Sequence, residues 1–174
     1  FAEFESTKSV VVAVVDGAGV GDLITANNPG PSRIWINSGD ATFDTSTTLD
    51  IAAEHIAAGD FDNDGDIDLV GAEVGPNRIW WNDGSGSFSN DGTQLEDGIT
   101  SHVVVADLDL DGDNDIVTAN WRNEPSMIWI NKDGQFFDGD VALDPEARSE
   151  HVAVGDVDAD GDLDIYFAIR QAPN

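Results

Sequence analysis

Three nine-residue stretches of the chain place aspartate at every second position and glycine at the sixth. They are DFDNDGDID at 60–68, DLDLDGDND at 107–115 and DVDADGDLD at 156–164. Two carboxylates about 4 Å apart repel each other by roughly 4 kcal/mol at an effective dielectric constant near 20. Such a stretch must therefore stay open in water or enclose a cation. Carboxylate oxygens are the ligands that Ca²⁺ prefers in proteins, so the spacing favours calcium.

The EF-hand, another acidic calcium loop, does not fit these stretches. It needs a glutamate at position 12, where this chain has Gly71, Thr118 and Phe167. It also needs a helix after the loop, whereas β-rich residues follow here. A solvated acidic turn without an ion is the alternative for any single stretch. Three copies in one register favour calcium in all three.

A fourth and weaker copy, VVDGAGVGD, occupies residues 14–22. Asp16 and Asp22 keep positions 3 and 9, but Val14 and Ala18 replace the acids at positions 1 and 5. Two carboxylates are too few for a strong calcium site. We therefore predict no calcium here, and the missing charges allow this turn to close without an ion.

The acidic stretches belong to a longer repeat, because their starting points are 47 and 49 residues apart. A near-constant long period indicates one supersecondary unit repeated along the chain. Each unit has an apolar run before the acidic stretch, a second run after it and a third run containing Ile-Trp, all typical of β-strands. First strands are expected at 9–15, 55–59, 102–106 and 151–155, second strands at 22–26, 68–72, 115–119 and 164–168, and third strands at 33–37, 78–82 and 127–131. No helical periodicity appears, so the pattern predicts an all-β fold.

Composition narrows the class of protein further. The 174 residues carry a formal charge of −28 and are 40% hydrophobic. This acidity makes nucleic acid and anionic lipid poor partners, while the hydrophobic content argues against a disordered acidic tail. No apolar run approaches the 18 residues of a membrane span, so no membrane insertion is expected. The chain has no cysteine, which excludes disulfides and thiolate metal sites.

The succession of an apolar strand, DxDxDGxxD, a second strand and RIWxNxGxGxF resembles the FG-GAP (VCBS-type) repeat, from which the integrin α-subunit propeller is built. The resemblance implies a β-propeller with blades of four antiparallel strands, about three and a half of them in this chain. We expect one partial propeller domain over 1–174. Its blades are expected at about 5–50, 51–98, 99–147 and, incomplete, 148–174.

The same resemblance implies calcium in the loop between the first two strands of a blade, at three sites in blades 2, 3 and 4. The side chains at positions 1, 3, 5 and 9 are expected to bind the ion, while position 7 offers its carbonyl and turns its side chain away. The side-chain ligands are Asp60, Asp62, Asp64, Asp68, Asp107, Asp109, Asp111, Asp115, Asp156, Asp158, Asp160 and Asp164. The carbonyl ligands are those of Asp66, Asp113 and Asp162.

Two kinds of residue outside the loops are candidates for other roles. His55, His102 and His151 recur at one repeat position, about 16 Å along the strand from the calcium loop, and recurrence favours a structural role. Trp121, Arg122 and Asn123 instead break the repeat in a loop, where departures are better indicators of function. They are a candidate ligand contact.

The favoured function is an extracellular, calcium-binding propeller that mediates adhesion by binding a carbohydrate or protein partner. The sequence contains no GxSxG, no HExxH and no cysteine nucleophile, so no enzymatic activity is expected. The alternatives are a structural subunit of an extracellular assembly or filament and, less favoured, part of a polysaccharide-active enzyme. The fourth repeat ends after its second strand, so we expect either missing blades of a longer chain or self-association to complete the ring.

Overall fold

The computed structural model describes residues 6–40, 42–43, 47–122, 124–139 and 148–170. Within these ranges the secondary structure consists of antiparallel strands, and no helix occurs. The first four strands form one sheet in the order β1-β2-β3-β4. Their bounds are β1 (Thr7–Ala13), β2 (Asp22–Asn27), β3 (Ser32–Trp35) and β4 (Thr47–Leu49). This sheet is blade 1, and it confirms the predicted four-stranded antiparallel unit.

The next strands form a sheet of seven in which blades 2 and 3 share β8. The path runs β11-β10-β9-β8-β6-β5, and β7 pairs with β6. The bounds are β5 (Ala53–Gly59), β6 (Asp68–Asn82), β7 (Phe88–Ser89), β8 (Gln94–Ala106), β9 (Asp115–Asn120), β10 (Met127–Lys132) and β11 (Gln135–Asp138). The last hairpin, β12 (Ser149–Gly155) with β13 (Asp164–Ile169), belongs to blade 4.

Strand β6 contains the second and third strands that the repeat predicts for blade 2. Fifteen extended residues would span about 50 Å. Nevertheless the Asn82 N–H donates a hydrogen bond to Asp68 Oδ1 at 2.8 Å, so the two ends of β6 meet. Gly75, with a φ of 110°, lies where the chain reverses. Strand β8 is also longer than predicted, because it continues from blade 2 directly into blade 3.

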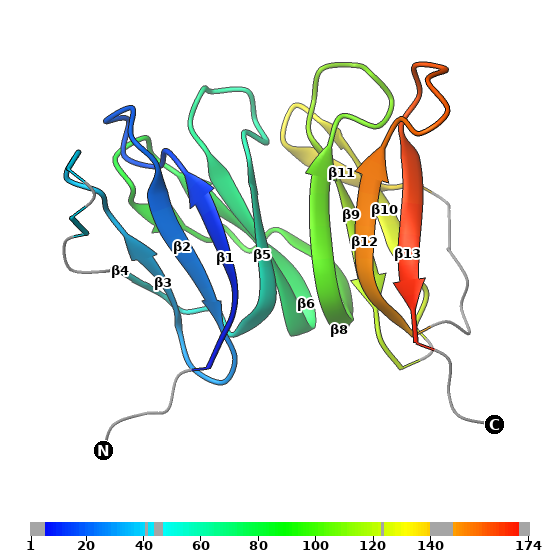
Figure 1. The fold of residues 1–174 in the computed structure, drawn as a ribbon, viewed down its shortest axis with the longest axis horizontal. Coiled ribbons are helices and arrows are strands. Elements are labelled where there is room, and N and C mark those ends of the chain that lie inside the picture. Colours follow the sequence, from blue (N-terminus) through cyan, green and yellow to red (C-terminus); the bar gives the residue numbers. More distant parts are fainter. Residues whose placement is uncertain (1–5, 41, 44–46, 123, 140–147, 171–174) are drawn as a thin grey trace.

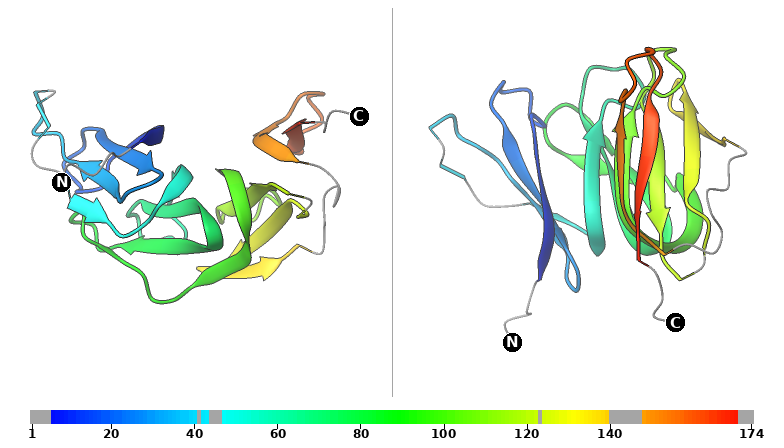
Figure 2. Two further views of the ribbon diagram at one scale, coloured as in Figure 1. Left: turned by 90° about the horizontal axis from the view of Figure 1, so that it is seen from below. Right: turned by 45° about the vertical axis from the view of Figure 1, so that its right-hand side comes forward.

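The blades follow one another along an open arc, which is clearest in the view from below in Figure 2. Strands β1, β5, β8 and β12 lead the four blades. Strand β5 contacts both β1 and β8, and β12 contacts β8. The four loops that join the first and second strands all lie at the upper end in Figure 1, away from the two chain termini. The arc therefore has one end formed by the acidic loops and an opposite end free of them.

The hydrophobic core lies between neighbouring blades. One cluster joins blades 1 and 2, a second joins blades 2 and 3, and a third joins blades 3 and 4. The recurring tryptophans contribute to them, as Trp80 packs into the first cluster and Trp129 against the second. Large aromatic side chains thus fill the gaps between blades.

Candidate functional site

The acidic loops close through residues with positive φ. The glycine at position 6 has φ values of 95°, 101° and 100° at Gly65, Gly112 and Gly161. Glycine thus permits a backbone conformation at position 6 that is rarely open to other residues. Position 4 is also left-handed, with φ values of 59° at Asn63 and 61° at Leu110. The sequence did not predict this second feature, because position 4 carries a different residue in each loop.

Closing the loops brings three carboxylates of each acidic stretch together. One oxygen from positions 1, 3 and 9 lies within 4.8 Å of the others in every group. The groups are Asp60, Asp62 and Asp68; Asp107, Asp109 and Asp115; and Asp156, Asp158 and Asp164. All three groups lie in the same register of the repeat and at the same end of the arc. Within the described ranges, loop 14–21 contains no such group.

The acids at positions 5 and 7 lie outside these groups. At position 5, Asp64 accepts a hydrogen bond from the N–H of Asp66 at 2.9 Å, and Asp111 and Asp160 do the same with position 7 of their loops. At position 7, Asp113 Oδ2 accepts the Asp133 N–H at 2.9 Å. The other oxygen of Asp113, Oδ1, accepts a hydrogen bond from Asn63 Nδ2 in the blade 2 loop, so this position-7 side chain contacts its own blade and the blade before it.

The position-9 carboxylate also joins strands within the blade. Asp68 Oδ2 accepts the Phe61 N–H at 3.0 Å and Oδ1 accepts the Asn82 N–H at 2.8 Å. Asp115 makes the same two bonds in blade 3, and Asp22 makes them in blade 1. This explains why Asp22 is present in a loop that lacks two other acids. The sequence assigned position 9 to a cation alone and missed the structural role.

Burial and neighbouring acids disfavour the negative charge of two position-9 carboxylates. Burial, aided by Asp62 and Asp64, raises the pKa of Asp68 to about 6, although two backbone N–H groups oppose the rise. Burial likewise raises the pKa of Asp115. Asp60 Oδ1 is buried and has no hydrogen-bond partner among the described residues. An orphaned carboxylate oxygen beside two others is the donor set that a hard divalent cation accepts.

Asparagines of the Ile-Trp strands link blades 2 and 3 to the loop of the blade before. Asn82 Nδ2 donates to the carbonyl of Val15 at 2.8 Å, and Asn131 Nδ2 donates to the carbonyl of Phe61 at 2.7 Å. Both asparagines are buried. The repeated asparagine in RIWIN, RIWWN and MIWIN was the sequence signal for this contact, and it was not used.

The recurring histidines form a row along the leading strands. The ring centroids of His55 and His102 are 3.9 Å apart, and those of His102 and His151 are 4.8 Å apart. Burial, with smaller contributions from His102 and His151, lowers the pKa of His55 to about 4. The row packs strand against strand, and these imidazoles lie away from the acidic loops.

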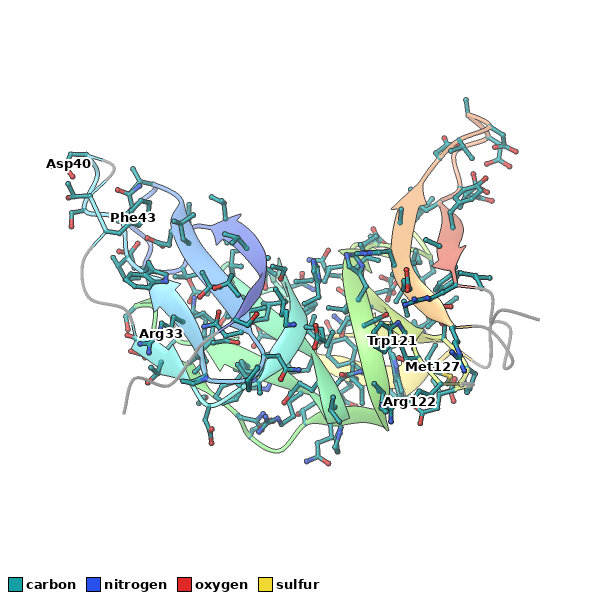
Figure 3. The ribbon with its side chains drawn as sticks, turned by 60° about the horizontal axis from the view of Figure 1, so that its bottom comes forward. Arg33, Asp40, Phe43, Trp121, Arg122 and Met127 are labelled. Carbon is teal, nitrogen blue, oxygen red and sulfur yellow. The ribbon has the colours of Figure 1, made fainter. Side chains whose placement is uncertain are left out.

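Trp121 and Arg122 lie at the end of the arc opposite the acidic loops. They line a pocket of about 330 Å³ together with Arg148, Glu150 and Arg170. A second pocket of about 370 Å³ adjoins it and shares Trp121, Arg122 and Glu150. Figure 3 shows the two labelled side chains on blade 3, beside the β12 hairpin. Asn123, the third predicted contact, lies outside the described residues.

This fold and these loops define a repeat β-propeller of the kind whose blades carry acidic loops at one end. The FG-GAP-like repeat family model matches residues 15–71, 60–118 and 107–167. The chain therefore belongs to the FG-GAP-like repeat family, as the sequence predicted. No match is found among curated proteins. No helix in the described part of the chain is long and apolar enough to cross a bilayer.

Solved structures show the same fold at low identity. An Agrocybe aegerita lectin, described as specifically recognising non-reducing terminal N-acetylglucosamine, is 21% identical with a TM-score of 0.60. The match covers 90% of this chain and 45% of the lectin chain. BBS1N, in complex with ARL6DN, is 14% identical with a TM-score of 0.59, covering 98% of this chain and 60% of that one. The chain thus spans about half the length of these propellers.

Proposed function

We propose that this protein is a calcium-stabilised extracellular propeller module that binds a carbohydrate or protein ligand. The observation that carries the calcium assignment is the threefold recurrence of one carboxylate arrangement, in one register, at one end of the arc. The Trp121–Arg122 pocket at the other end supports the ligand assignment. Calcium and ligand would therefore occupy opposite ends of the blades.

Calcium in this proposal has a structural role: it supplies positive charge that offsets the repulsion among the carboxylates of a loop. Positions 1, 3 and 9 would hold the ion with their grouped oxygens, joined by position 5 and the position-7 carbonyl. Because Asp68 at position 9 also accepts a hydrogen bond from Asn82 of the third strand, an ion held there would connect the acidic loop to that strand. Millimolar calcium outside cells suits loops of this type.

The proposed ligand class rests on the pocket and on the neighbours. Trp121 is 39% exposed, an unusual position for a large aromatic side chain, and arginines surround it. Tryptophan and arginine are enriched among residues that dominate binding energy. One structural neighbour is a lectin and another is solved with a protein partner, which supports either kind of ligand.

A structural subunit of an extracellular assembly is the second candidate. It is favoured by apolar side chains that are exposed on the first and last blades, such as Val10 and Tyr166. Further blades of a longer chain or a second copy of this one would cover them. We also propose that the protein binds its ligand without catalysing a reaction. A role within a polysaccharide-active enzyme would require catalytic groups from elsewhere.

Glycan and protein arrays probed with the protein in millimolar calcium test the ligand assignment. The variant Trp121→Ala should lose the signal, because it removes the exposed ring from the pocket. Phe43→Ala is the matched control, since Phe43 is also 39% exposed but lies on blade 1, far from Trp121 in Figure 3. Unchanged binding by Trp121→Ala, or equal loss in both variants, would contradict this site.

A further inference from the structure

Basic residues are scarce in this chain but concentrated at the Trp121–Arg122 pocket. The whole sequence has seven lysines and arginines against 35 acids. Four of the seven line the two adjoining pockets: Lys8, Arg122, Arg148 and Arg170. We propose that this pocket binds a terminal acidic sugar, with its carboxylate held by the arginines and its ring packed on Trp121. This inference rests on the ligand-binding function proposed above.

The pocket arises where blade 3 departs from the other blades. The residue after the second strand is Asn28 in blade 1, Val74 in blade 2 and Trp121 in blade 3. In blade 1, Asn28 Nδ2 donates to Glu54 Oε1 of the next blade at 2.9 Å. Trp121 has no amide with which to make that contact, and Glu150, the equivalent of Glu54, pairs with Arg170 at 3.4 Å. The boundary between blades 3 and 4 is therefore lined by the Trp121 ring and by the charged side chains of Glu150 and Arg170.

Arg122 occupies a backbone conformation that does not suit arginine. Its φ is 62°, and at the corresponding point of blade 2 the residue is Gly75, with a φ of 110°. A non-glycine residue in the left-handed region costs about 1 kcal/mol. Packing does not account for arginine here, because the side chain is exposed and has no ion pair within the described ranges. We attribute the arginine at this position to the positive charge that it brings to the pocket.

The Trp121 backbone is fixed before any ligand arrives. Its N–H donates to the carbonyl of Ile99 at 2.8 Å, and the Ile99 N–H donates to Glu124 Oε2 at 2.7 Å. The preceding Asn120 is buried, and its Nδ2 donates to the carbonyl of Pro125 at 2.8 Å. A backbone held at these points loses little conformational freedom on binding, which favours affinity.

The mixture of charges distinguishes an acidic sugar from other anions. Arginine pairs bidentately with a carboxylate, and Arg122 and Arg148 are both exposed at the pocket. Glu150 lines this pocket and the adjoining one, and Glu54 lines the adjoining one; carboxylates of this kind accept hydrogen bonds from hydroxyl groups. A sugar acid offers one carboxylate with several hydroxyls. An acidic peptide or a densely sulfated chain offers mainly negative charge, which the glutamates and the net charge of −28 repel.

The test is calorimetric titration with methyl glycosides of glucuronic and galacturonic acid and with neutral methyl glucoside, in millimolar calcium. The wild-type protein should bind an acidic glycoside at least about tenfold more tightly than the neutral one. Arg122→Asn should lose about tenfold for the acid alone, because asparagine tolerates positive φ and the change removes only the charge. Lys132→Gln removes one positive charge near the acidic loops. It should leave the affinities for the acidic glycosides and for the neutral glycoside unchanged.

Each contrary result has a distinct meaning when the calcium content and thermal midpoint of the same samples are recorded. Equal affinity for acidic and neutral glycosides would overturn the acidic sugar and leave glycan binding standing. Tighter binding of a short polyglutamate peptide than of either sugar acid would also overturn it, and would favour a protein ligand. No binding of any probe by a folded, calcium-loaded protein would overturn the acidic sugar and count against the pocket as the proposed ligand site.

Discussion

At the scale of single residues, position 4 of the acidic loops has a left-handed backbone conformation that the alternating aspartates do not predict. Asn63, Leu110 and Ala159 all have φ near 60° there. Asparagine adopts this conformation readily, whereas leucine and alanine do not. The aspartate spacing and the glycine at position 6 were enough to predict the turn. They could not reveal the second left-handed residue, because its type varies among the loops.

Replacing Leu110 with asparagine should stabilise the protein by about 0.5–1 kcal/mol, because it relieves the left-handed strain. Leu110 is 59% exposed, so little buried apolar surface is lost. Thermal unfolding in calcium gives the comparison with wild type. Val157→Asn, at another exposed loop position whose φ is not positive, is the control and should give no gain. A lower midpoint for Leu110→Asn would refute the strain argument.

Asn131→Ala should destabilise the protein by about 2–4 kcal/mol, because the buried carbonyl of Phe61 and the partly buried carbonyl of Asn114 lose their donor. The same substitution at Asn37 should cost about 1 kcal/mol, since among the described residues Asn37 Nδ2 bonds only within its own blade, to the carbonyl of Gly21. Denaturant unfolding of the two variants measures both costs. Equal losses of unfolding free energy in the two variants would mean that the contact of Asn131 with the preceding blade adds no stability.

At the scale of elements, the repeat predicted most strands and every acidic loop, because alternation and turn residues act locally. It did not predict that β6 and β8 run on without interruption. The predicted strands of blade 2, at 68–72 and 78–82, leave residues 73–77 outside the sheet, yet Val74 and Gly75 pair with Ile99 and Gly98 of β8. Such pairing depends on partners about 25 residues away, which a local pattern does not contain.

The histidine row links the leading strands and should make stability depend on pH. The folded-state pKa of His55 is about 4, below its ordinary value of 6.5, mainly because of burial. Between these values the unfolded chain binds a proton that the folded chain does not, so stability is complete above pH 6.5 and falls toward pH 4. The loss from this residue is at most about 3 kcal/mol, less where solvent reaches the ring.

Unfolding free energies measured at fixed calcium from pH 7 to pH 4.5 test this dependence. His55→Gln should show a shallower loss than wild type across that window. His151→Gln should keep most of the slope, because it leaves the burial of His55 in place. If His55→Gln and wild type lose stability in parallel, the row has no such role.

At the scale of the whole molecule, the outer faces of blades 1 and 4 expose positions whose equivalents in the other blades are buried. Tyr166 is 54% exposed, while its equivalents Val70 and Val117 are at most 1% exposed. Val10 is 55% exposed, while its equivalent Ile56 is fully buried. The buried equivalents pack in the clusters between neighbouring blades. Both open faces therefore have the composition of a contact between blades.

We expect the 174-residue chain to self-associate through these faces, because apolar surface of this kind favours association. Light scattering coupled to size exclusion measures the mass as a function of concentration. Tyr166→Lys should shift the distribution toward monomer, whereas Val74→Lys, at an exposed valine on blade 2, should not. A wild-type chain that stays monomeric at high concentration would contradict this expectation.

The central claim, calcium in three acidic loops, is tested most directly by native mass spectrometry in a volatile buffer containing calcium, repeated after chelation. The account predicts three calcium ions per chain, lost on chelation, and two ions in the variant Asp62→Asn. No specifically bound calcium would contradict the claim, and four ions would show that loop 14–21 was misinterpreted.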